Sequence, residues 1–80
     1  LLEPLMAVEV VVPEEFMGDV IGDLQSRHGR VENIEQRGEL RVVSGVAAMR
    51  DLFGYSTRLR SITQGRGTFT MQFARFDRLA

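Results

Sequence analysis

The spacing of hydrophobic residues switches several times along the chain between a pattern typical of strands and a pattern typical of helices. The order of these patterns restricts the folds that the chain can adopt. The segment 5–12 reads LMAVEVVV, which is nearly continuous in hydrophobicity and rich in β-branched residues. Such a run is typical of a central strand that is covered on at least one face. The segment 68–76 alternates instead, with Phe69, Met71 and Phe73 on one face. We therefore predict a strand at each place and expect these three residues in the core.

A helical pattern follows the first strand. The apolar residues Met17, Val20, Ile21 and Leu24 recur at the spacing that directs one stripe of a helix toward a core. Proline suits the first position of a helix because its missing N–H needs no partner there. The helix is therefore predicted to begin at Pro13.

Three glycines bear on this helix. Gly29 is predicted to supply the left-handed residue that ends it. Gly18 and Gly22 lie one turn apart inside it, where each glycine costs up to about 1 kcal/mol relative to alanine. Close packing against the sheet or a second helix would explain them, and so would a close approach of RNA. Packing is the preferred explanation.

Two further extended segments form a predicted hairpin. The segments 30–36 and 40–46 flank the dipeptide Arg37-Gly38, which has the length and the glycine of a hairpin turn. In the first of them Val31 and Ile34 are three residues apart, which breaks the strict alternation of a strand. We therefore expect a β-bulge near Glu32 and Asn33.

A second helical region is predicted from about Ala48, with an interruption at Gly54. Its candidates for burial are Met49, Leu52, Phe53, Leu59 and Ile62. The predicted order is then strand, helix, strand, strand, helix, strand, which matches the α+β ferredoxin-like (split βαβ) fold. Right-handed crossovers would place both helices on one face of a four-stranded antiparallel sheet. We expect one domain over residues 1–80, with the other sheet face open.

The charge distribution is uneven along the chain. The formal net charge is -1, but residues 1–26 carry six acidic residues and no basic one, whereas residues 27–80 carry ten arginines and five acidic residues. This division indicates a local basic face on an otherwise neutral body, although charges of this kind often only solvate a surface. The apolar run from Val10 to Val12, like every other apolar run in the chain, is far shorter than the roughly 20 residues of a membrane helix.

The residue inventory argues against several kinds of chemistry. Without cysteine the chain has no disulfide and no thiolate metal site, which fits a reducing compartment. His28 is the single histidine, so neither a histidine metal cluster nor a serine-histidine-acid triad is expected. The segment 64–68 reads QGRGT, but it lacks the lysine and the strand-loop-helix order of a nucleotide-binding loop. We predict no catalytic residue and no metal site.

The arginines of the chain, by contrast, are suited to binding phosphate groups. We expect Arg58, Arg60 and Arg66 to surround one corner of the molecule, where the two glycines of QGRGT would expose backbone N–H groups to RNA. The same glycines could instead form only a helix C-cap and a sharp turn. The predicted third strand, RVVSGV, has no aromatic residue on which a base could stack. RNA contacts are therefore expected from loops and helix ends.

Several motifs together resemble a known family. The segments EPLMAVEVVVPEEFMGDVIGDLQSRHG, QRG, LFGYS, LRS and TQGRGT are similar to the C-terminal domain, domain V, of elongation factor G. The resemblance implies a domain that docks a translational GTPase on the large ribosomal subunit, between the stalk base and the sarcin-ricin loop region. It also implies a cytoplasmic location, neighbouring domains of the same factor as partners, and GTP and Mg²⁺ in a domain that lies elsewhere in the parent.

The sequence departs from the family pattern at some positions. Val12 stands where the family usually has threonine, Ala48 where it has proline, and Arg58 where it has an acidic residue. These departures leave open whether the parent is the translocation factor, a recycling form or a ribosome-protection protein. The chain also begins without methionine, and we expect it to be part of a longer protein.

Seven residues are expected to contact RNA at the ends of the two predicted helices and in the following loops. They are Arg27, His28, Arg30, Arg58, Arg60, Gln64 and Arg66. Arg60 could instead be a structural ion-pair partner. The alternative function is a regulatory module of the same fold that binds a small metabolite.

Overall fold

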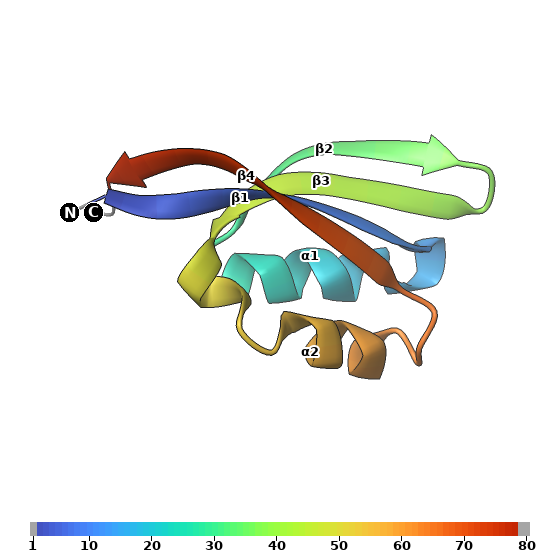
Figure 1. The fold of residues 1–80 in the computed structure, drawn as a ribbon. Helices are drawn as coiled ribbons and strands as arrows, with labels where there is room; N and C mark the ends of the chain where they lie inside the picture. Colours follow the sequence, from blue (N-terminus) through green and yellow to red (C-terminus); the bar gives the residue numbers. More distant parts are fainter. Residues whose placement is uncertain (1, 79–80) are drawn as a thin grey trace.

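A four-stranded antiparallel sheet carries two helices on one of its faces (Figure 1). The computed structural model describes residues 2–78. The strands are β1 (Leu2–Pro13), β2 (Arg30–Arg37), β3 (Leu40–Ala48) and β4 (Thr68–Arg78), in the order β2-β3-β1-β4. The helices are α1 (Met17–Ser26) and α2 (Tyr55–Ile62), preceded by the 3₁₀ turns η1 (Glu14–Phe16) and η2 (Met49–Leu52). The predicted ferredoxin-like βαββαβ fold is confirmed.

The core lies between the sheet and the two helices. Alternate residues of β1 point into it, including the fully buried Val10 and Val12. From α1 the buried residues are Val20 and Leu24, while Met17 and Ile21 pack at its border. The predicted apolar stripe of α1 is therefore confirmed.

Helix α1 begins later than predicted. Pro13 is still part of β1, where it pairs with Leu40 of β3. The 3₁₀ turn then brings Phe16 into the core before the α-helix starts at Met17. The fixed φ of proline suits an extended residue as well as a helical one, so the sheet pairing decides its conformation.

The predictions for the glycines of α1 were wrong. A Cβ atom at Gly18 or Gly22 would meet nothing within 4 Å, so close packing does not explain either residue. The left-handed residue after the helix is His28, with φ 64°, and not Gly29. Gly29 has a different role, because a Cβ atom there would lie 3.0 Å from the carbonyl oxygen of Leu24.

The hairpin of β2 and β3 contains the predicted bulge. The register between the strands shifts between Val31 and Asn33, which leaves Glu32 without a partner. Gly45 lies opposite this irregularity, and a Cβ atom there would overlap the carbonyl group of Arg30. The turn itself is Gly38-Glu39, one residue later than predicted.

The second helical region is interrupted at Gly54 as predicted, with φ 73°. Leu52 and Leu59 are buried, and Ile62 packs against the core. The prediction was wrong for Met49 and for Phe53, whose side chain is 79% exposed. Phe53 has an extended backbone at the end of the 3₁₀ turn and points outward, and the fully buried aromatic residue is Tyr55.

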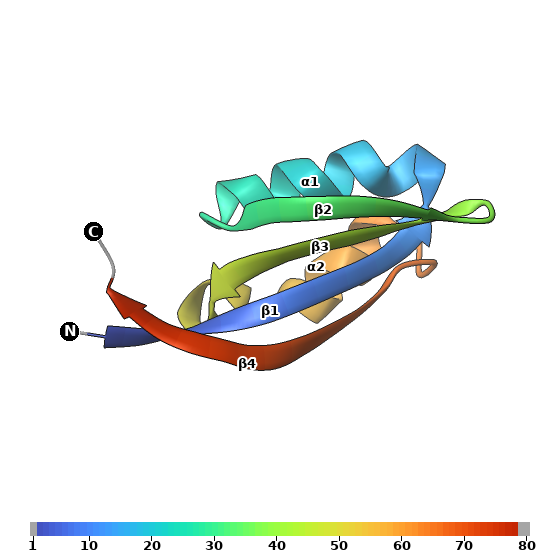
Figure 2. The same ribbon diagram turned by 90° about the horizontal axis from the view of Figure 1, so that it is seen from above.

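Strand β4 extends beyond the cover that the helices provide (Figure 2). Phe69 packs against Tyr55 with 5.0 Å between ring centroids, but Met71 is exposed and Phe73 is 56% exposed. A helix of the length of α2 reaches only about 12 Å, so it covers the first part of the strand alone. Phe73 instead contacts Phe76, at 5.1 Å between ring centroids. The expectation that Met71 and Phe73 are core residues was wrong.

Candidate nucleic-acid interface

The seven predicted RNA contacts lie in three places. Arg27, His28 and Arg30 follow the C-terminal end of α1, Arg58 and Arg60 lie on α2, and Gln64 and Arg66 follow its C-terminal end. The two helices run in opposite directions along the sheet, so their C-terminal ends lie at opposite ends of the helical layer (Figure 1). The structure does not bring the seven residues together in one cluster.

Arg27 is held by contacts within the protein. Its Nε donates to Asp23 Oδ2 at 3.2 Å, and its Nη1 donates to the carbonyl oxygens of Asp51 at 2.9 Å and Phe53 at 3.0 Å. The guanidinium also lies 5.2 Å from the ring centroid of Tyr55, and the side chain is only 21% exposed. Arg27 therefore connects the end of α1 to the segment between η2 and α2.

Asp23 joins the two helices. It accepts from Arg27 through one carboxylate oxygen and from Arg58 Nε through the other, at 3.2 Å in each pair. The spacing of this acid along α1 is typical of a solvated face, and the sequence did not indicate its bridging position. Arg58 consequently turns toward α1, and the expectation that it shares one corner with Arg60 and Arg66 does not hold.

His28 and Arg30 are exposed at the edge of the sheet. The His28 ring is 85% exposed, and its Nδ1 lies 3.9 Å from Asp51 Oδ2. Its backbone has φ 64°, which a residue with a side chain adopts at a cost of roughly 1–2 kcal/mol. Within residues 2–78, Arg30 forms no ion pair.

The loop after α2 uses its backbone donors internally. The N–H of Gly65 donates to the carbonyl oxygen of Arg60 at 2.8 Å, and the N–H of Gly67 donates to Thr63 Oγ1 at 2.9 Å. The N–H of Arg66 is also bonded, to the carbonyl oxygen of Thr63 at 3.0 Å. The prediction that this turn offers free N–H groups to phosphate was wrong, and the C-cap and turn interpretation is confirmed.

The arginine side chains of this region face solvent. Arg66 Nη1 lies 3.4 Å from Glu15 Oε1, but its side chain is 60% exposed. An exposed pair of this kind contributes at most about 1 kcal/mol and is screened by salt. Arg60 is exposed and forms no ion pair with any residue that the structure describes. The alternative role of Arg60 as a structural ion-pair partner therefore finds no support among these residues.

Tyr55 is a buried polar residue that the sequence analysis did not single out. Burial, and to a smaller extent the nearby Asp23 carboxylate, raises the pKa of its hydroxyl to about 12, while Arg27 opposes the shift. The hydroxyl has no hydrogen-bond partner among the described residues. Its position beneath Arg27 gives it a packing role at the end of α1.

The described residues offer neither a metal-binding cluster nor a membrane-spanning helix. Over residues 2–78, no group of three or more histidine, aspartate or glutamate side chains is placed to hold a metal ion. In the same part of the chain no helix is both long and apolar enough to cross a membrane.

Comparison with known proteins connects this fold to one family. Residues 1–80 match the family described as elongation factor G C-terminus. A crystal structure of a protein from Thermus thermophilus is similar to the chain with a TM-score of 0.88 and 37% sequence identity over 94% of the chain. The chain spans only 11% of the length of that protein.

Proposed function

The chain belongs to the elongation factor G C-terminus family, and from this premise we propose that it is a ribosome-binding domain. It docks an elongation factor G-like GTPase on the large ribosomal subunit during translocation. Its contacts are with ribosomal RNA near the sarcin-ricin loop and the stalk base. GTP and Mg²⁺ are bound by another domain of the parent in the cytoplasm, and this domain contributes binding without catalysis.

The observation that carries this proposal is the exposure of arginines that are not committed to the fold. Arg60 and Arg30 have no ion pair among residues 2–78, and Arg66 has one weak pair at the surface. Arginine presents a planar fork that matches phosphate oxygens, and such contacts dominate the affinity of proteins for RNA. His28 and Gln64 stand beside these arginines at the two helix ends and would add polar contacts.

The remaining two residues of the predicted set, Arg58 and Arg27, are less available for contact with RNA. Arg58 is exposed but shares Asp23 with Arg27, so RNA would have to compete with that carboxylate. Arg27 donates to three acceptors inside the protein. We assign it the role of holding the segment from Asp51 to Phe53 in place, and any contact of Arg27 with RNA stays a prediction.

Neighbouring domains of the same factor are the second proposed partner. Phe73 and Phe76 are exposed on the overhanging part of β4, and Phe53 is exposed beside η2. Phe73 and Phe76 contact each other, and contiguous apolar side chains of this kind at a surface are typical of interaction sites. The greater length of the solved relative is consistent with a domain that packs against these rings.

A small-metabolite module has less support. The most enclosed hollow of the described residues measures about 200 Å³. A free metabolite is usually enclosed on most of its surface in a site of roughly 300–1,000 Å³, so this hollow is too small to enclose one. Larger hollows of about 310, 410 and 550 Å³ lie on the face of the sheet, beside the hairpin turn and between the helices, but each of them is more open to solvent.

Binding of the chain to purified ribosomal subunits tests the proposal. We expect binding to large subunits, weaker binding to small subunits, and an affinity that falls as salt is raised. The variant Arg60→Gln/Arg66→Gln should bind large subunits about tenfold more weakly, because each lost phosphate contact removes part of the electrostatic attraction.

Arg37→Gln is the matched control. Arg37 lies next to the hairpin turn, is 62% exposed and forms a weak pair with Glu35, much as Arg66 does with Glu15. Its replacement should leave the affinity unchanged. The control removes one charge and the double variant removes two. A loss in the control of half the loss of the double variant, or more, would therefore mean that only net charge matters, and the proposed site would be rejected.

A further inference from the structure

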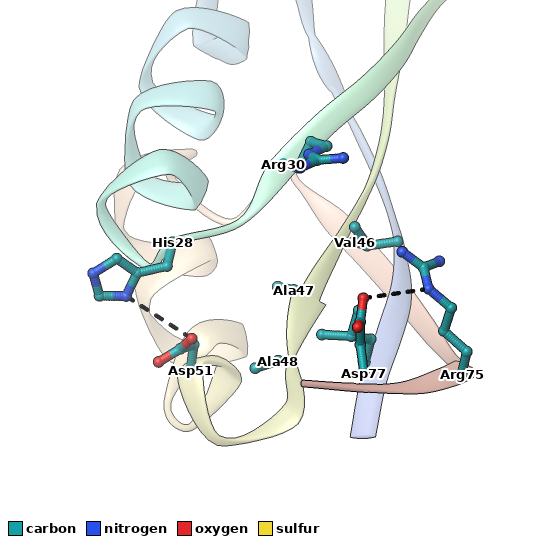
Figure 3. A pocket seen from close by; sticks show the side chains of 9 residues that line it. His28, Arg30, Val46, Ala47, Ala48, Asp51, Arg75 and Asp77 are labelled. Carbon is teal, nitrogen blue, oxygen red and sulfur yellow. Dashed lines mark ion pairs between the residues drawn. The ribbon is translucent and has the colours of Figure 1, made fainter. Parts of the chain in front are cut away.

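A hollow lies at one end of the sheet, and its lining includes two of the predicted RNA-contacting residues, His28 and Arg30 (Figure 3). Leu5 of β1 pairs with Ala48 of β3, and Val46 lies two residues before Ala48 on the same strand. These three apolar residues line the hollow, which measures about 200 Å³. Because side chains alternate across a strand, these three point to the face opposite the helices, whereas Ala47, which also lines the hollow, points to the helical side with Met6 and Val8.

Two arginines from the outer strands flank this apolar floor. Arg30 of β2 pairs with Val46, and Arg75 of β4 pairs with Leu5. The register therefore places both guanidiniums on the open face, one on each side of the hollow. Arg30 has no ion pair among residues 2–78, and Arg75 lies 3.7 Å from Asp77 with both side chains more than half exposed. A phosphate group could replace this weak pair at little cost.

Carboxylates and a histidine complete the rim. Asp77 faces Arg75, and Asp51 faces His28, as Figure 3 shows. A site of arginines alone would fit any phosphate, and an apolar floor alone would fit many side chains. The combination fits a narrower range of ligands, because it offers hydrogen-bond donors for a phosphate, acceptors for an amino group and an apolar surface for a flat ring.

We propose that this hollow binds one unpaired ribonucleotide of ribosomal RNA whose base carries an amino group. The base lies on Leu5 and Val46, beside the nearly buried Ala48, its amino group donates to Asp77 or Asp51, and the adjoining phosphates contact Arg30 and Arg75. The absence of an aromatic residue on this face is no obstacle, since arginine planes and aliphatic side chains also contact bases. This inference rests on the proposed function and adds Arg75, Asp51 and Asp77 to the RNA-contacting residues.

The first test uses ribosomal subunits and the variant Arg30→Gln/Arg75→Gln. Both side chains are exposed, so the substitutions should leave folding intact, which circular dichroism checks. We expect the affinity for large subunits to fall about tenfold, and the dependence of log affinity on log salt to lose about 1 unit of slope per arginine. The variants Arg60→Gln/Arg66→Gln and Arg37→Gln are measured in parallel.

The parallel variants separate two kinds of failure. If the unaltered chain does not bind large subunits, the proposed function fails and this inference fails with it. If the chain binds and only Arg60→Gln/Arg66→Gln weakens it, the proposed function stands and the nucleotide site is rejected.

The second test uses short RNA as the probe. Octacytidylate, whose bases carry amino groups, should bind more tightly than octauridylate, whose bases do not, and more tightly than a duplex of octacytidylate with octaguanylate. Arg30→Gln/Arg75→Gln should weaken octacytidylate binding, and Asp77→Asn should reduce the preference for cytidine over uridine. Equal binding of the three RNAs by the unaltered chain would overturn the proposal.

Discussion

The C-terminal ends of α1 and α2 share the same pattern of backbone hydrogen bonds. After α1, the N–H groups of His28 and Gly29 donate to the carbonyl oxygens of Gln25 and Leu24. After α2, those of Gln64 and Gly65 donate to Ser61 and Arg60 in the same pattern. Both ends are Schellman motifs in which a residue other than glycine is the first left-handed one, with φ 64° at His28 and 55° at Gln64; after α2 the next residue, Gly65, is left-handed too, with φ 80°.

The side chains that secure the two ends differ. At the end of α1 the guanidinium of Arg27 spans to the carbonyl oxygens of Asp51 and Phe53. At the end of α2 the buried hydroxyl of Thr63 donates to the carbonyl oxygen of Leu59 and accepts from the N–H of Gly67. A short side chain performs this role at α2, so the nearby Arg66 is left at the surface.

This difference separates a structural arginine from an arginine that can bind a partner. Both Arg27 and Arg66 follow a helix in a sequence rich in arginine, and by position they are equal candidates for RNA contact. The number and burial of their protein acceptors distinguish them. Each prediction below changes one member of this comparison.

The largest expected effect is that of Arg27→Ala. The substitution removes an ion pair and two charge-assisted hydrogen bonds from a mostly buried side chain, which should lower the free energy of unfolding by about 3 kcal/mol. Arg66→Ala should change it by no more than about 0.5 kcal/mol. Urea denaturation of both variants measures these values, and equal effects would break the comparison.

Thr63→Val should have the next largest effect. Valine keeps the shape of threonine but leaves the N–H of Gly67 without an acceptor in a partly buried place, so we expect a loss of about 2 kcal/mol. The exposed Thr57 provides a matched control, and Thr57→Val should lie within about 0.5 kcal/mol of the unaltered chain. A Thr63 variant as stable as this control would show that the hydroxyl does not secure the end of α2.

Tyr55, beneath Arg27, makes stability depend on pH at the alkaline end. Its pKa is about 12 in the folded chain and 10.0 in the reference state, so between these values the folded state keeps a proton that the unfolded state loses. Stability is therefore full below pH 10 and falls by about 2 kcal/mol as pH rises toward 12.

Tyr55→Phe separates this contribution from other alkaline effects. The variant should lose the tyrosine part of the pH dependence, and at neutral pH its stability should stay within about 1 kcal/mol, because the hydroxyl has no partner to lose among the described residues. Thermal unfolding between pH 7 and pH 11 compares the two chains, and identical alkaline slopes would contradict the assignment.

The smallest expected effects are those of His28→Gly and Gln64→Gly. Glycine adopts the left-handed conformation without the cost of roughly 1–2 kcal/mol that a side chain adds, but it also makes the unfolded chain more flexible by about 0.4–1 kcal/mol. The free energy of unfolding of both variants should rise by about 0.5 kcal/mol. The two gains should be similar, because both helix ends share the same hydrogen-bond motif. A gain at one helix end and a loss at the other would show that the motifs are not equivalent.

The sequence predicted the parts of this fold that depend on local spacing. The apolar stripe of α1, the bulge at Glu32 and the break at Gly54 each follow from a pattern within a few residues, and each is confirmed. The exposure of Phe73 could not be predicted in this way. Alternation along β4 shows which side chains share a face, but the length and position of α2 decide how much of that face is covered.

The candidate site could be predicted only in part. The sequence indicated which residues are arginines, and helix patterns placed Arg27 and Arg66 after helix ends. It did not indicate that Asp23 would pair with both Arg27 and Arg58, because Asp23 and Arg58 are 35 positions apart in the chain. It also gave no sign of Arg75, whose position across the hollow from Arg30 depends on the order of strands in the sheet.

The central claim is that exposed arginines bind ribosomal RNA while Arg27 maintains the fold. The most direct test measures the affinity for large subunits at several salt concentrations, for the unaltered chain and for Arg60→Gln/Arg66→Gln. The account predicts that the double variant has the same unfolding free energy within about 0.5 kcal/mol and a salt dependence that is shallower by about 1 unit of slope per arginine. Identical slopes for the two chains would contradict it.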